Sequence, residues 1–144
     1  MNGLLRSVAV VESATSSGFM APLHAHDADE AVHVVEGRNT LYARETTVTL
    51  EAGETFVVPQ GVAHTYRADS SPARSLFTTV TPSAGRYEDF LRAAGPPARG
   101  PAGAPVWSEE DLAAVAAIAA EADVTVLGPP GMLPADVETA ARAA

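Results

Sequence analysis

Residues 18–37 read GFMAPLHAHDADEAVHVVEG, and this stretch decides the fold. His24 and His26 stand two residues apart and are followed by a turn-like Asp-Ala-Asp run. Side chains two apart in a strand leave the same face, about 6.5 Å from each other along the backbone. A β-branched run opens at Glu30 and stops at Gly37, which predicts a second strand. We therefore expect the Glu30 carboxylate to lie close to both imidazoles across a hairpin.

A second informative stretch covers residues 53–64, GETFVVPQGVAH. It predicts a turn at Gly53, a buried strand over 55–58, a tight Pro-Gln-Gly turn and a new strand that carries His64. If that strand lies beside the strand of His24 and His26, three neutral imidazoles and one carboxylate surround a common point. Such a ligand set suits Fe(II), Mn(II), Co(II), Ni(II), Cu(II) or Zn(II), and the ligand types do not choose among these ions.

The alternation of side chains along a strand also assigns the neighbouring residues to the inner or the outer face. Tyr66 shares the face of His64, so we expect it to point inward near the metal, as a catalytic residue or as a core aromatic. His33 falls on the face opposite to Glu30, so we expect it on the outside. A metal-free cluster of buried polar side chains would need a hydrogen-bond partner for every polar atom, which favours a metal site.

The first part of the chain, residues 1–82, predicts an all-β domain. Short β-branched runs are separated by Gly and Pro at brief intervals, which is typical of a sandwich or barrel and not of βαβ units. These runs cover residues 7–11, 31–35, 46–50, 55–58 and 76–80.

The remainder, residues 83–144, predicts a C-terminal helical tail. A short helix at 86–94 places Tyr87, Phe90 and Leu91 on one face. The tail then continues with a linker at 95–107 that holds seven Gly or Pro, a helix at 108–122, a strand at 123–127 and a weak helix from Pro134 onward.

The two histidine stretches resemble the two motifs of the cupin superfamily. The first motif matches at every defining position, in the order Gly18, His24, His26, Glu30 and Gly37. The second matches at Gly53, Pro59, Gly61 and His64, and it departs from the family pattern at Ala68, where the family has Asn. Two spaced motifs over some fifty residues are a far stronger signal than one short pattern.

The resemblance implies a double-stranded β-helix of jelly-roll type, with one divalent transition metal ion per chain inside the barrel. His24, His26, Glu30 and His64 would be the ligands, and Glu30 would also be a catalytic base. The tail is similar to that of small single-domain cupins related to quercetin dioxygenases. This likeness implies a dioxygenase that acts with dioxygen on a small, flat, oxygenated molecule such as a flavonol, an enediol or a diketone. The family also implies a homodimer.

Two other functions stay open. The ion could act as a Lewis acid without redox chemistry, in an isomerase, cyclase, dehydratase or decarboxylase. The chain could instead be a non-catalytic module that binds a small molecule. A hydrolase with a serine nucleophile is disfavoured, because the sequence has no Gly-x-Ser-x-Gly elbow.

The composition limits the kinds of molecule that the protein could bind and the chemistry that it could perform. The formal net charge is −9, from nine arginines, no lysine and eighteen acidic residues, which disfavours nucleic acid and anionic membrane surfaces. No cysteine is present, which excludes a thiolate nucleophile and fits a reducing compartment. No secretory signal or membrane-spanning stretch is evident, so we expect a cytoplasmic protein.

Overall fold

Two antiparallel sheets face each other in the computed structural model, which describes residues 7–81, 84–94 and 109–143. The four-stranded sheet has the order β1 (Ser7–Thr15), β8 (Ala73–Thr81), β3 (Glu30–Glu36) and β6 (Thr55–Val58). The five-stranded sheet has the order β5 (Thr46–Glu51), β4 (Arg38–Ala43), β7 (His64–Ala68), β2 (Leu23–His26) and β9 (Val124–Gly128). The expected all-β architecture is confirmed.

Strand β3 shows how the two faces are divided. Glu30, Val32 and Val34 are buried, whereas the alternate side chains are half-buried or exposed. His33 therefore lies on the outer face, as predicted, where its Nδ1 lies 2.7 Å from the Thr55 hydroxyl. Between the sheets the inward side chains form one apolar cluster of Val32, Leu41, Ala43, Val58, Val62 and Phe77.

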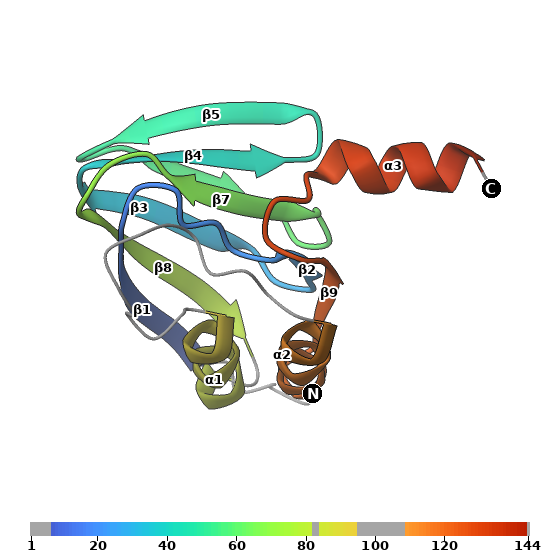
Figure 1. Ribbon diagram of the computed structural model, residues 1–144. Coiled ribbons are helices and arrows are strands. Elements are labelled where there is room, and N and C mark those ends of the chain that lie inside the picture. Colours follow the sequence, from blue (N-terminus) through green and yellow to red (C-terminus); the bar gives the residue numbers. More distant parts are fainter. Residues whose placement is uncertain (1–6, 82–83, 95–108, 144) are drawn as a thin grey trace.

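Helices close one end of the sheets. Helix α1 (Ala84–Ala94) and helix α2 (Glu109–Glu121) lie side by side below β1, β8 and β9 in Figure 1. Three acidic residues occupy the first turn of α2, where the helix dipole favours negative charge. A second apolar cluster joins both helices to the sheets and consists of Ala9, Tyr87, Phe90, Val115, Ala119, Ala122 and Val124.

The tail contributes a strand to the barrel. After α2, Asp123 adopts a left-handed backbone (φ 58°) that turns the chain into β9, and β9 pairs antiparallel with β2. Helix α3 (Pro134–Ala143) then extends away from the sheets (Figure 1). The linker expected at 95–107 and the start of the helix expected from 108 lie outside the described residues. The division at residue 82 stays a prediction. No described helix is both long enough and apolar enough to cross a membrane.

Two glycines of the motif stretches allow a matched test of the fold. Gly37 and Gly53 both have a left-handed backbone, with φ of 81° and 92°. A methyl group at Gly37 would overlap the Ser70 hydroxyl and the Pro72 carbonyl, whereas one at Gly53 meets open space. Gly53→Ala should cost about 1–2 kcal/mol in unfolding free energy, from backbone strain alone.

Gly37→Ala should cost a further ~1–3 kcal/mol, because overlap in a packed site is added to the same strain. Chemical denaturation of the metal-free proteins measures both values. Equal losses for the two variants would mean that the contact between Gly37 and the loop at 70–72 does not matter.

Candidate metal centre

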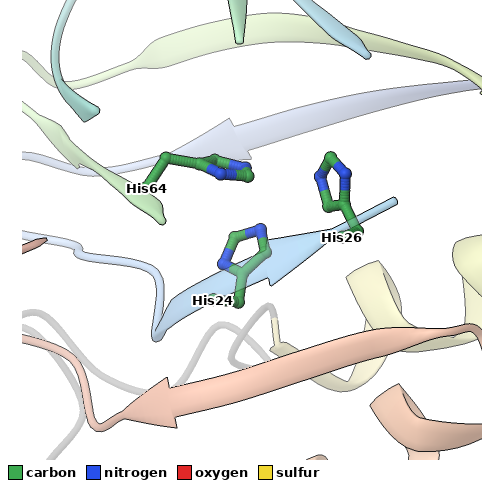
Figure 2. Close-up of side chains that lie close together, drawn as sticks. All are labelled: His24, His26 and His64. Carbon is green, nitrogen blue, oxygen red and sulfur yellow. The ribbon is translucent and has the colours of Figure 1, made fainter. Parts of the chain in front are cut away.

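Strand register brings the three histidines together. His24 and His26 point to the same side of β2, and His24 pairs directly with His64 at the start of β7. The ring centroids lie 4.3 Å apart for His24 and His64, 4.8 Å for His26 and His64, and 5.7 Å for His24 and His26. One ring nitrogen from each residue lies within 4.8 Å of the others, and all three side chains are buried. Figure 2 shows the rings converging between the sheets.

Each ring is oriented by a backbone carbonyl two residues away in the chain. The Nδ1 atoms lie 2.8 Å from the Pro22 carbonyl for His24, 2.9 Å from the Ala28 carbonyl for His26 and 2.8 Å from the Val62 carbonyl for His64. A carbonyl oxygen only accepts, so Nδ1 carries the hydrogen and donates it. The lone pair of a neutral ring then resides on Nε2, which is the arrangement that histidine ligands use.

Two of these Nε2 atoms form no hydrogen bond with any described residue. Within the described part of the chain, His24 Nε2 and His64 Nε2 are buried and form no hydrogen bond. An unpaired buried polar atom costs about 1–3 kcal/mol. A cation at the point of convergence would remove that cost, so these donors fit a divalent transition metal.

Glu30 approaches the same point from the opposite sheet. Its side chain is 2% exposed, with Oε1 3.5 Å from His64 Nε2 and Oε2 3.6 Å from His26 Nε2. Two atoms bound to one ion at about 2.1 Å each lie at most ~4.2 Å apart, so both separations suit a shared ion. The structure thus brings the three histidines together in one group and places Glu30 beside two of them, His26 and His64.

Burial and charge define the protonation of the group. Burial, with the neighbouring His64 as a second cause, lowers the pKa of His24 to about 3 and keeps this ring neutral. Burial alone would raise the pKa of Glu30, but His26 and His64 outweigh it and hold that pKa well below its usual range. Burial alone would lower the pKa of His26, but the Glu30 carboxylate outweighs it and raises that pKa. The group therefore contains an ionised carboxylate beside the imidazoles, and this charge favours a cation.

Tyr66 is the residue that we expected to point inward near the metal. Its side chain does point inward, and it lines one cavity together with His24, Glu30 and His64. Its hydroxyl, however, lies 3.4 Å from the Ser13 hydroxyl, and its ring packs against Phe77 with centroids 5.1 Å apart. Burial raises the pKa of Tyr66 to about 12, so the phenol is neutral.

The cavity that leads to the histidines has a volume of about 450 Å³. Its wall is largely apolar, with Leu41 and Phe77 from the sheets and Phe90 and Leu91 from α1. The Phe90 ring also meets the His24 ring edge-on, with centroids 5.2 Å apart. The cavity thus joins a polar centre to a pocket in the size range of small-molecule sites.

The sequence did not single out Tyr87 as part of the site. This residue is 1% exposed, and its hydroxyl donates a hydrogen bond to Glu30 Oε2 and lies 3.4 Å from His26 Nε2. Its helical spacing with Phe90 and Leu91 predicted a packed face. The only sign in the sequence that Tyr87 could reach the site was its phenol on the packed face of the helix. No residue near position 87 indicates where this helix packs on the sheets.

Two facing antiparallel sheets with buried histidines between them fit the double-stranded β-helix that the cupin motifs implied. The family comparison agrees, because residues 13–79 match the cupin domain. The chain is thus similar to cupins over residues 13–79, slightly less than half of its length, and its fold is a jelly roll. No curated protein matches the chain.

Of three similar solved structures, the first supports the fold, and the other two are weaker likenesses. An RmlC-like cupin from Shewanella frigidimarina is 24% identical with a TM-score of 0.50, over 56% of this chain and 70% of that one. The conserved protein SPY1581 of unknown function from Streptococcus pyogenes is 20% identical with a TM-score of 0.48, over 51% of this chain and 63% of that one. KdgF from Halomonas is 19% identical with a TM-score of 0.49, over 52% of this chain and 77% of that one. The chain therefore spans less than two thirds of the Streptococcus protein, and at these identities the likeness concerns the fold alone.

Removal of one imidazole tests the ligand assignment. His64→Ala should weaken Co(II) binding by more than the roughly 10- to 100-fold that loss of an outer partner costs, because a direct ligand is removed. Circular dichroism should show the β fold retained. His33→Ala is the matched control, since His33 lies on the outer face, and it should bind as the wild type does. Unchanged metal content in His64→Ala would refute the assignment.

Metal affinity should also depend on pH. A proton competes with the ion for the Nε2 lone pair of a histidine ligand. Because Glu30 raises the pKa of His26, this competition begins above the ordinary histidine value of about 6.5. Affinity should therefore decrease as the pH drops through about 6. Calorimetric titration with Co(II) from pH 5 to pH 8 measures it, and a flat profile would contradict competition at these nitrogens.

Proposed function

We propose that this protein is a metal-dependent dioxygenase that acts on a small, flat, oxygenated organic molecule. His24, His26, Glu30 and His64 would hold one redox-active divalent ion. The observation that carries the proposal is that, among the residues described, His24 Nε2 and His64 Nε2 are buried without a hydrogen bond, in residues that line a largely apolar cavity. The resemblance to quercetinase-like cupins supports the reaction class, and a flavonol, an enediol or a diketone is the expected kind of substrate.

When bound, the ion would supply a Lewis acid for a substrate oxygen and electrons for dioxygen. The residues of the chain would do the rest. Glu30 is ionised and buried, so it can accept the proton of an enol or phenol that enters beside it. Leu41, Phe77 and Phe90 would exclude water and hold the flat body of the substrate.

Tyr66 would serve as a hydrogen-bond donor to the substrate. Its phenol stays neutral because burial raises its pKa to about 12, and it lines the same cavity as His24, Glu30 and His64. The Ser13 hydroxyl lies 3.4 Å from the Tyr66 hydroxyl and would hold it in place. A second substrate oxygen directed toward these two hydroxyls would be oriented relative to the first.

Oxygen consumption tests the reaction class. Protein loaded with Fe(II), Mn(II), Co(II), Ni(II) or Cu(II) should consume dioxygen with at least one member of a panel of flavonols, enediols and diketones. Tyr66→Phe should lower kcat by about 100-fold, the lower end for loss of one hydrogen-bond donor to the reacting substrate. His64→Ala provides the matched protein without a complete centre and should be inactive.

Two results would count against a dioxygenase. No uptake with any redox metal over the whole panel would exclude the proposed class. Turnover that persists with Zn(II) and without dioxygen would instead assign the centre to Lewis-acid chemistry, such as isomerisation or decarboxylation.

A homodimer stays a prediction of the family resemblance. The outer face of the four-stranded sheet supports it, because Val8, Val10, Val57 and Val80 are exposed there, and β1 is a nine-residue edge strand. A cytoplasmic location likewise stays a prediction.

A further inference from the structure

Helix α1 brings the hydroxyl of Tyr87 to the candidate metal centre. The matched cupin domain ends at residue 79, so this helix follows the matched part of the chain. Its inner face bears Tyr87, Phe90 and Leu91, at the spacing of neighbours on one side of a helix. Phe90 and Leu91 line the cavity, whereas Tyr87 lies outside the cavity lining and contacts the ligands from behind.

The ring of Tyr87 is anchored by packing. It belongs to the apolar cluster that includes Ala9 of β1, Val115 of α2 and Val124 of β9. It also meets the His26 ring edge-on, with centroids 5.5 Å apart. A phenol held by three elements can deliver its hydroxyl to one place with little freedom.

That place is one particular oxygen of Glu30. The Tyr87 hydroxyl donates to Oε2, and the Thr79 hydroxyl donates to the same atom at 3.2 Å. The other oxygen, Oε1, lies toward His64 Nε2 at 3.5 Å. An ionised carboxylate accepts through both oxygens, and here two donors engage Oε2. Oε1 is therefore the oxygen that stays available to a cation at the centre.

We propose that Tyr87 is a positioning residue, whose hydroxyl inserted from α1 holds the Glu30 carboxylate so that Oε1 faces the metal. This inference rests on the proposed metal centre. Outer partners of this kind set the orientation of a ligand, and their loss typically costs 10- to 100-fold in metal affinity. Tyr87 would act through Glu30 and would not touch the substrate.

Tyr87→Phe tests the proposal, because it removes the hydroxyl and keeps the packed ring. Tyr42→Phe makes the same chemical change on the partly exposed Tyr42 of β4 and is the matched control. The Co(II) affinity and the visible absorption spectrum of bound Co(II) are measured for the wild type and both variants, with thermal unfolding of the metal-free proteins alongside.

Tyr87→Phe should bind Co(II) about 10- to 100-fold more weakly and show an altered spectrum, while Tyr42→Phe matches the wild type. Affinity and spectrum unchanged in Tyr87→Phe would overturn the proposal. Loss of cooperative unfolding in metal-free Tyr87→Phe would also overturn it, because Tyr87 would then be needed for the fold itself. A wild type that binds no Co(II) would refute the proposed function, a result distinct from a failure confined to Tyr87.

Discussion

The candidate centre depends on one repeated interaction, the hydrogen bond from each histidine Nδ1 to a backbone carbonyl two residues away. This bond keeps each ring in one tautomer and points its Nε2 lone pair into the barrel. Each carbonyl lies only two residues from its ring in the chain. The local backbone therefore fixes the direction in which each Nε2 atom points. The sheet then needs only to place β2 beside β7 for the three donors to meet.

The opposite sheet supplies the charge. Glu30 opens β3 directly after the turn that ends β2, so one short connection carries the chain from two imidazoles to the carboxylate that faces them. Burial on its own would neutralise such a carboxylate, but the adjacent imidazoles keep it ionised. The Glu30 carboxylate in turn raises the pKa of His26.

The sequence predicted those parts of the site that arise from local geometry. The period of two along a strand put His24 and His26 on one face, Glu30 on the inner side of β3 and His33 on the outer side, because parity depends on neighbouring residues alone. The same rule turned Tyr66 inward, but it could not show that the hydroxyl lies against Ser13, since that contact joins strands far apart in sequence. Tyr87 was missed for a similar reason. A helical face predicts packing, whereas the atom that it meets depends on how α1 docks between β1 and α2.

The most direct test of the account is an X-ray absorption spectrum at the edge of whatever metal the protein contains when it is purified without added ions. Three imidazoles and one carboxylate predict nitrogen and oxygen neighbours at about 2.1 Å, together with the outer-shell scattering of three rings. Protein without a transition metal, or a metal whose spectrum lacks the imidazole contribution, would contradict the account.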